Sequence, residues 1–168
     1  FIKRIEKFII KNNKKLIGWD EILEGGLAPS ATVMSWRGVH GGIESARAGH
    51  DVIMCPTSHC YFDHHQAAPE FSPDAFGGYT TLKKVYSFDP IPEELSKNQS
   101  NYILGGQGNL WTEYVQTPDL AQYRVLPRMT ALSEVLWTGS GSHTFENFYY
   151  RLIEIEKRFD QLDWAYAP

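Results

Sequence analysis

A chain of 168 residues fits one ordinary domain, and 42% hydrophobic with 14% aromatic residues supply a sizeable core, which argues against disorder. The formal net charge of −4 comes without a basic cluster, so nucleic acid is not the expected partner. No apolar run approaches the roughly 20 residues of a membrane-spanning helix. The two cysteines, Cys55 and Cys60, are too few for a disulfide framework, and their spacing matches no zinc or redox signature. Because the chain begins inside a periodic segment, we expect it to be a piece of a longer protein.

The first predicted elements are an amphipathic helix and a short strand. Apolar residues recur at helical spacing over residues 1–9, and Asn12 and Asn13 end this pattern. Residues 15–19 are short and apolar and predict a buried strand. Residues 21–27, which contain two adjacent glycines, predict a turn or a short helical piece.

Three further strands are predicted, at residues 31–36, 51–55 and 102–106. A short helix ended by glycine is predicted at 41–49. The segment between the third and fourth strands is long enough that it is expected to be functional or to carry a helix of its own, which its prolines and glutamates place near residues 91–95.

The C-terminal part is predicted to be helical. A long helix over residues 119–137 contains Pro127, which should kink it or mark a fresh start. A last amphipathic helix runs over residues 144–159, with Thr144 in the position of a cap. The alternation of helices with four short strands that look buried on both faces predicts an α/β fold with parallel strands linked by crossovers.

An aromatic residue follows each of the four predicted strands, and two carboxylates lie beyond the third and the fourth. Because the carboxyl ends of parallel strands lie on one face of the sheet, we expect these side chains to converge on one pocket. Indole faces pack against the C–H faces of a sugar and carboxylates accept hydrogen bonds from its hydroxyls, so a carbohydrate site is predicted; the alternative is that these aromatics fill the core. The six residues are Trp19, Trp36, Tyr61, Asp63, Trp111 and Glu113.

Five motifs in this order carry a resemblance to a known family: GWDE at 18–21, MSWRG at 34–38, YFD at 61–63, GGQGNLWTE at 105–113 and PRMTALSE at 127–134. Together they resemble the second half of a glycoside hydrolase family 20 β-N-acetylhexosaminidase, over about residues 1–140. The resemblance implies that the four strands are the fifth to eighth of a (β/α)8 barrel. Residues 141–168 would then form a C-terminal helix that packs on the barrel.

The resemblance also implies an activity: retaining, exo-acting hydrolysis of terminal N-acetylglucosamine or N-acetylgalactosamine, with the substrate's own acetamide as the nucleophile and no cofactor or metal. It suggests a secreted, periplasmic or lysosomal protein. By position, the three indoles resemble those that wall the sugar, the phenol resembles the group that orients the acetamide oxygen, and the two carboxylates resemble those that hold the ring hydroxyls. These residues are, in that order, Trp19, Trp36 and Trp111, then Tyr61, then Asp63 and Glu113.

The family's catalytic Asp-Glu pair follows the fourth strand and is expected upstream of Phe1. No catalytic residue is therefore expected in this chain, which by itself should be inactive. The alternative is a non-catalytic fragment that binds amino sugars or has a structural role. The expected partners are an amino-sugar glycan and either the missing N-terminal half of the barrel or a second copy, because the first and fourth strands would present unpaired edges.

Other residues invite a chemical interpretation. Asp20 and Glu21 imitate an acid/base pair, but neighbouring residues at a strand end seldom face one substrate, so capping or pairing with a basic side chain is the better prediction. Arg128 and Glu134 are expected to form a structural ion pair or cap. A metal-dependent hydrolase is a third hypothesis, with its ligands among His59, Cys60, Asp63, His64 and His65, although their spacing fits no common zinc pattern.

Overall fold

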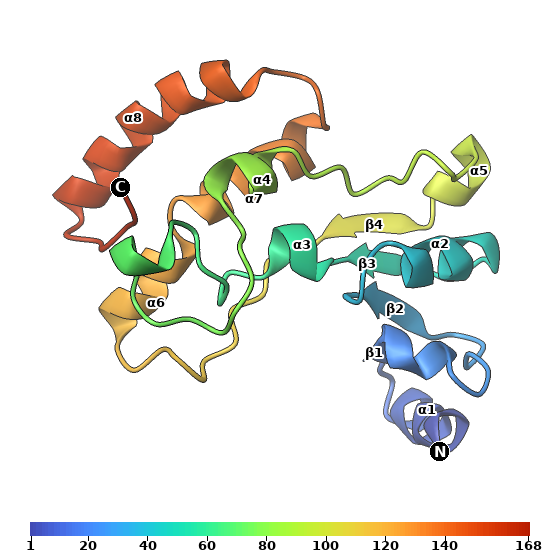
Figure 1. Ribbon diagram of the computed structural model, residues 1–168. Coiled ribbons are helices and arrows are strands. Elements are labelled where there is room, and N and C mark those ends of the chain that lie inside the picture. Colours follow the sequence, from blue (N-terminus) through green and yellow to red (C-terminus); the bar gives the residue numbers. More distant parts are fainter. The chain divides into compact units, whose positions relative to one another are not determined.

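The computed structural model describes all 168 residues, which form two compact units (Figure 1). The first unit consists of Phe1–Thr57 and Pro90–Gln107, and the second of Ser58–Asp89 and Gly108–Pro168. None of the helices is both long and apolar enough to cross a membrane.

The first unit contains a parallel sheet whose four strands lie in chain order: β1 (Ile17–Trp19), β2 (Thr32–Ser35), β3 (Val52–Met54) and β4 (Ile103–Gly106). Each lies within a predicted strand, and the predicted parallel arrangement is confirmed. In the register, Gly18 is paired with Val33 and Val33 with Val52. A register shift between Val52 and Ile53 interrupts the ladder to β4.

Burial differs between the inner and outer strands. Val33, Val52 and Met54 on β2 and β3 are fully buried. On the outer strands, however, Ile17 is 52% and Leu104 is 60% exposed. The prediction that all four strands are buried on both faces is therefore wrong for β1 and β4, each of which has one neighbouring strand only.

Four helical segments belong to the first unit: α1 (Ile2–Lys11), the 3-10 helix η1 (Asp20–Leu23), α2 (His40–Arg47) and α5 (Lys97–Ser100). The apolar face of α1 packs Ile2 and Ile9 against Leu16. Helix α2 packs on β2 and β3. This approach is close because Gly42 has no side chain: a Cβ there would lie 2.5 Å from the Sδ atom of Met54.

The prediction of a helix near residues 91–95 is wrong. The backbone forms a turn there, in which the amide of Leu95 donates to the carbonyl of Pro92 at 3.1 Å. Helix α5 begins only after Ser96, whose hydroxyl accepts from the amide of Gln99 while the Gln99 side chain accepts from the amide of Ser96. This capping box fixes the start of the helix beyond the Pro-Glu-Glu segment.

The second unit is mainly helical. It contains η2 (Pro69–Phe71), α4 (Leu82–Tyr86), α6 (Pro118–Val125), α7 (Arg128–Thr138) and α8 (Phe145–Gln161). The short helix α3 (Thr57–Cys60) begins on the last residue of a first-unit segment and continues into the second unit. The helix predicted over 119–137 is thus two helices, and a fresh helix starts after Pro127, which follows a cis peptide bond. Helix α4 lies in the long segment between β3 and β4, but not at residues 91–95, where the sequence placed a helix.

Helix α8 begins as predicted, since the hydroxyl of Thr144 accepts from the amide of Asn147 at 3.2 Å. Its buried side includes Phe148, which stacks on Tyr86 of α4 with ring centroids 4.5 Å apart. An ion pair between Arg151 and Glu134 links α8 to α7. Both the core contact and the ion pair therefore fix α8 within the second unit.

Candidate functional site

Two of the six predicted site residues lie together in the first unit. Trp19 ends β1, and Trp36 directly follows β2. Their ring centroids are 6.5 Å apart and their planes are inclined by 79°, which is the edge-to-face arrangement that aromatic pairs favour. Parallel pairing of the two strands produces this contact, because it places both strand ends at the same edge of the sheet.

The adjacent acids Asp20 and Glu21 both bind the segment that carries Trp36. The buried Asp20 carboxylate accepts hydrogen bonds from the amides of Trp36 at 3.0 Å and Arg37 at 3.2 Å, and from Arg37 Nε at 2.5 Å. Glu21 Oε2 accepts from the indole Nε1 of Trp36 at 2.9 Å. The prediction of pairing with a basic side chain is confirmed for Asp20, whereas Glu21 binds the indole of Trp36.

Arg37 reinforces this arrangement. Its Nη1 also pairs with Glu24 at 2.7 Å, and hydrogen bonds with Glu24 and Asp20 raise the pKa of the guanidinium above its ordinary value. A hollow of about 390 Å³ beside this ion pair is lined by residues that include Asp20, Arg37 and Glu44. None of the six predicted site residues lines the hollow.

The other four predicted residues lie in the second unit, on two segments that are hydrogen-bonded to each other. The amide of Phe62 donates to the carbonyl of Asn109, and the amide of Asn109 donates to the carbonyl of Cys60, both at 2.7 Å. This bridge aligns Tyr61 with Asn109 in a parallel manner. It brings the segment of Tyr61 and Asp63 beside the segment that continues to Trp111 and Glu113.

Asp63 is the most unusual acid of this set. It is only 5% exposed, and its Oδ1 atom has no hydrogen-bond partner. Burial raises the pKa of its carboxyl, and the nearby charge of Glu113 adds to the effect, while backbone amides and Arg128 oppose it. A buried carboxylate oxygen without a partner is costly in a folded protein and is typical of a position where a ligand supplies the missing donor.

Tyr61 is buried, and its ring packs against that of His64 with centroids 5.7 Å apart. The Nδ1 atom of His64 is in turn hydrogen-bonded to Thr80 Oγ1 at 3.2 Å, and burial lowers the pKa of this imidazole. Trp111 and Glu113 are exposed. The set therefore combines a buried phenol and carboxyl with an accessible indole and carboxylate.

A buried arginine, Arg128, supports these segments by hydrogen bonds to backbone carbonyls. Arg128 donates to the carbonyls of Phe62, His64, Thr80 and Arg124. Burial lowers its pKa to about 9, which leaves the guanidinium charged at neutral pH. A structural role for Arg128 was expected, but its partners are carbonyls, and Glu134 forms its ion pair with Arg151 of α8.

His59, one of the candidate ligands in the metal-site hypothesis, has other neighbours. No group of three His, Cys, Asp or Glu side chains in the chain could hold a metal ion. His59 packs on Phe88 with ring centroids 5.7 Å apart, and its Nδ1 lies 2.8 Å from the hydroxyl of Ser58. Burial lowers the pKa of His59 as well.

Comparison with known proteins identifies the family. The model of glycosyl hydrolase family 20, catalytic domain, matches residues 1–140. The chain belongs to glycosyl hydrolase family 20. The beta-hexosaminidase of Porphyromonas gingivalis is 50% identical over 161 residues, which are 95% of this chain and 21% of that protein. The beta-hexosaminidase of Vibrio furnissii is 34% identical over 85% of this chain and 23% of that protein.

Solved structures of the family share the fold. The GH20 exo beta-N-acetylglucosaminidase from Vibrio harveyi, solved in complex with N-acetylglucosamine, superposes with a TM-score of 0.88 at 26% identity and covers 99% of this chain. The chain covers 26% of that structure, so it spans about a quarter of the length of these GH20 relatives. The family resemblance carried by the five motifs and the α/β fold with a parallel sheet are confirmed.

Proposed function

We propose that this chain is the substrate-binding half of the catalytic domain of a retaining exo-β-N-acetylhexosaminidase, with β1–β4 as the fifth to eighth strands of a (β/α)8 barrel. Residues 1–140 would contribute to the barrel, and residues 141–168 would form the C-terminal helix that packs on it. The curated relatives are beta-hexosaminidases, and a structural relative was solved with N-acetylglucosamine. The substrate of the full-length protein would thus be a glycan that ends in N-acetylglucosamine or N-acetylgalactosamine.

The observation that carries this proposal is the buried carboxyl of Asp63, which lacks a donor at Oδ1 and lies two residues from the buried phenol of Tyr61. A sugar hydroxyl supplies the missing donor. A hydrogen bond to a charged group is worth about 1.5–3 kcal/mol, more than enough to select a sugar that presents a free hydroxyl there. Glu113, whose charge acts on Asp63, would accept from a second hydroxyl.

In the proposed reaction, the acetamide oxygen of the substrate attacks the anomeric carbon, and the bond from that carbon to the leaving oxygen breaks. The phenol of Tyr61 donates a hydrogen bond to the acetamide oxygen and orients it. Trp19, Trp36 and Trp111 wall the sugar and exclude water. The acid that protonates the leaving oxygen belongs to the Asp-Glu pair expected after the fourth strand, so the 168-residue chain alone would be inactive. Water then opens the cyclic intermediate with net retention.

A second candidate is a non-catalytic fragment that binds amino sugars or has a structural role. The exposed side chains of Ile17 and Leu104 on the two outer strands favour a requirement for a partner. That partner would be the missing half of the barrel or a second copy, because unpaired strand edges recruit other strands. Light scattering of the isolated chain tests this: association is expected, and a well-folded monomer would contradict it.

The enzyme proposal is tested with the full-length protein and two substrates, aryl N-acetyl-β-glucosaminide and aryl β-glucoside. We expect the acetamido sugar to be preferred by at least about 10³-fold in kcat/KM, because the glucoside lacks the internal nucleophile. Equal rates would refute the proposal. The isolated chain should hydrolyse neither substrate, and hydrolysis that is abolished by Asp63→Asn would refute the expectation that it is inactive.

A further inference from the structure

The segment of residues 66–79, here called the 66–79 loop, follows Asp63 closely and is closed at its base. The amide of Thr80 donates to the carbonyl of His65 at 2.8 Å, and His65 and Tyr79 form a parallel bridge. The side chain of Gln66 donates to the carbonyl of Tyr123 on α6 at 2.7 Å. Both ends of the loop are therefore fixed on the second unit.

Two buried arginines hold the 66–79 loop and its base. Arg124 donates to the carbonyls of Pro73 and Asp74, and Arg128 donates to those of His64 and Thr80. Burial lowers the pKa of both guanidinium groups, which reflects the cost of removing two charges from water. A loop that only connects two elements does not need two buried charges to fix its backbone. We therefore expect the position of this loop to serve a function.

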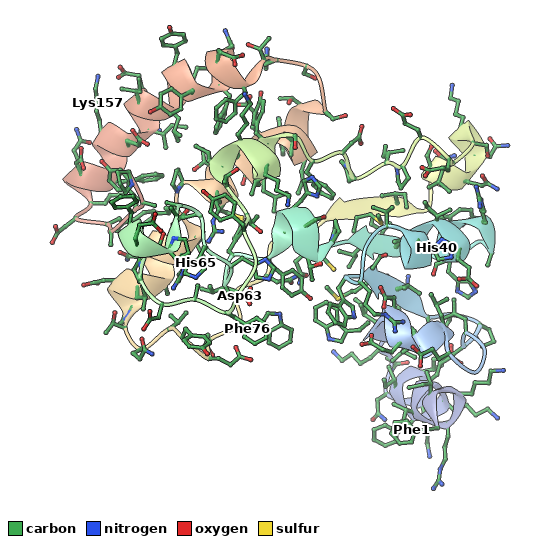
Figure 2. All side chains as sticks on the ribbon, in the orientation of Figure 1. Phe1, His40, Asp63, His65, Phe76 and Lys157 are labelled. Atoms are coloured by element: carbon green, nitrogen blue, oxygen red, sulfur yellow. The ribbon has the colours of Figure 1, made fainter.

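The loop presents an aromatic side chain beside the candidate site. The amide of Phe76 donates to the carbonyl of Asp63 at 3.3 Å, and Figure 2 shows Phe76 next to Asp63. The Phe76 side chain is nevertheless 57% exposed. Many large apolar side chains of this chain are exposed, but Phe76 is hydrogen-bonded through its backbone to the residue whose carboxyl lacks a donor, which places it where it can contact a ligand of Asp63.

The loop is also connected to the phenol of Tyr61, through the side chain of His64. Gly78 has φ +72°, and a Cβ at this position would lie 2.5 Å from His64 Nδ1. The backbone of the loop at Gly78 therefore lies close to the imidazole of His64, which packs on Tyr61. A backbone hydrogen bond therefore connects the loop to Asp63, and the packing of His64 connects it to Tyr61.

We propose that the 66–79 loop closes the carbohydrate site at the end where Asp63 accepts a sugar hydroxyl, and that Phe76 is a specificity-determining residue that excludes substituents on this hydroxyl. The inference rests on the proposed function. A free hydroxyl donates to Asp63 Oδ1, whereas an alkylated or glycosylated oxygen has no proton to donate and adds bulk where Phe76 lies. The loop thereby restricts the enzyme to an unsubstituted terminal sugar, while the leaving group at the anomeric carbon does not contact Phe76.

The test uses the full-length protein, the aryl N-acetyl-β-glucosaminide and its 3-, 4- and 6-O-methyl ethers. We expect the unmodified protein to discriminate against one ether by about 10²-fold or more in kcat/KM, since the ether lacks a donor and is bulkier. Phe76→Ala should raise the ratio of kcat/KM for this ether to kcat/KM for the parent substrate about tenfold. The matched control is Phe71→Ala, which removes a 79% exposed phenylalanine from the same loop and should leave the ratio unchanged.

An unchanged ratio in Phe76→Ala would overturn the proposal, and so would an equal change in Phe71→Ala. If the protein hydrolyses none of these glycosides, the proposed function fails, and calorimetric binding of N-acetylglucosamine and its methyl ethers then decides the role of the loop. Selective binding of the unmodified sugar that weakens in Phe76→Ala would support it. Equal binding of sugar and ethers by the unmodified protein would overturn it.

Discussion

Replacing Asp20 with alanine tests whether the acid pair after β1 positions the indole of Trp36. The carboxylate of Asp20 accepts two backbone hydrogen bonds, from the amides of Trp36 and Arg37, and lies in a buried position. Each hydrogen bond to a charged acceptor contributes about 1.5 kcal/mol, so the two together stabilise this segment by about 3 kcal/mol. The ion pair joins this buried carboxylate to the guanidinium of Arg37, whose side chain is 44% exposed, so screening by water reduces the contribution of the pair.

We expect Asp20→Ala in the full-length protein to lower the urea midpoint of unfolding and to raise KM about tenfold, since Trp36 is no longer fixed against Trp19. The matched control is Glu24→Ala, which removes the other carboxylate bound to Arg37 and should change neither quantity. An Asp20→Ala variant with the midpoint and KM of the unmodified protein would refute this role of Asp20, and so would an equal effect of Glu24→Ala.

Three further predictions concern the site. Tyr61→Phe should lower kcat by about 10²-fold and leave KM within about threefold, because the phenol acts on the attacking acetamide; an effect on KM alone in steady-state assays would contradict this. Since burial raises the pKa of Asp63, the folded protein protonates this carboxyl above its ordinary range, so sugar affinity should fall with decreasing pH through the raised pKa. Calorimetry should show this dependence in the unmodified protein and not in Asp63→Asn, and equal pH profiles would refute it. Glu21→Ala should raise KM severalfold while Glu21→Gln, which keeps an acceptor for the indole of Trp36, should restore it; no rescue by glutamine in the same assay would argue against this hydrogen bond.

The elements that were predicted correctly from the sequence have local causes. The four strands are short apolar runs bounded by glycine, proline or polar residues, and their parallel order follows from the helices between them. The cap at Thr144 and the fresh helix after Pro127 likewise depend on residues at those positions. By contrast, the helix predicted near residues 91–95 had proline and glutamate in favourable places, but the capping box of Ser96 and Gln99 determined the helix start instead.

The candidate site was predictable in its residue types more than in its supporting contacts. Strand-end aromatics and carboxylates are visible in the sequence, and the structure pairs Trp19 with Trp36. No sequence pattern marks an arginine that binds carbonyls. The hydrogen bonds from Arg124 to the carbonyls of Pro73 and Asp74 therefore could not be predicted without the positions of the backbone atoms. The same applies to the hydrogen bond from Trp36 to Glu21, which joins side chains far apart in the sequence.

A crystal structure of the full-length protein with N-acetylglucosamine tests the central proposal most directly. We predict that the sugar lies against the indoles of Trp19 and Trp36, that a ring hydroxyl donates to Asp63 Oδ1 at about 2.5–3.0 Å, and that the phenol of Tyr61 contacts the acetamide oxygen. A sugar bound elsewhere, with the Oδ1 atom of Asp63 still lacking a donor, would contradict the proposed role of this chain.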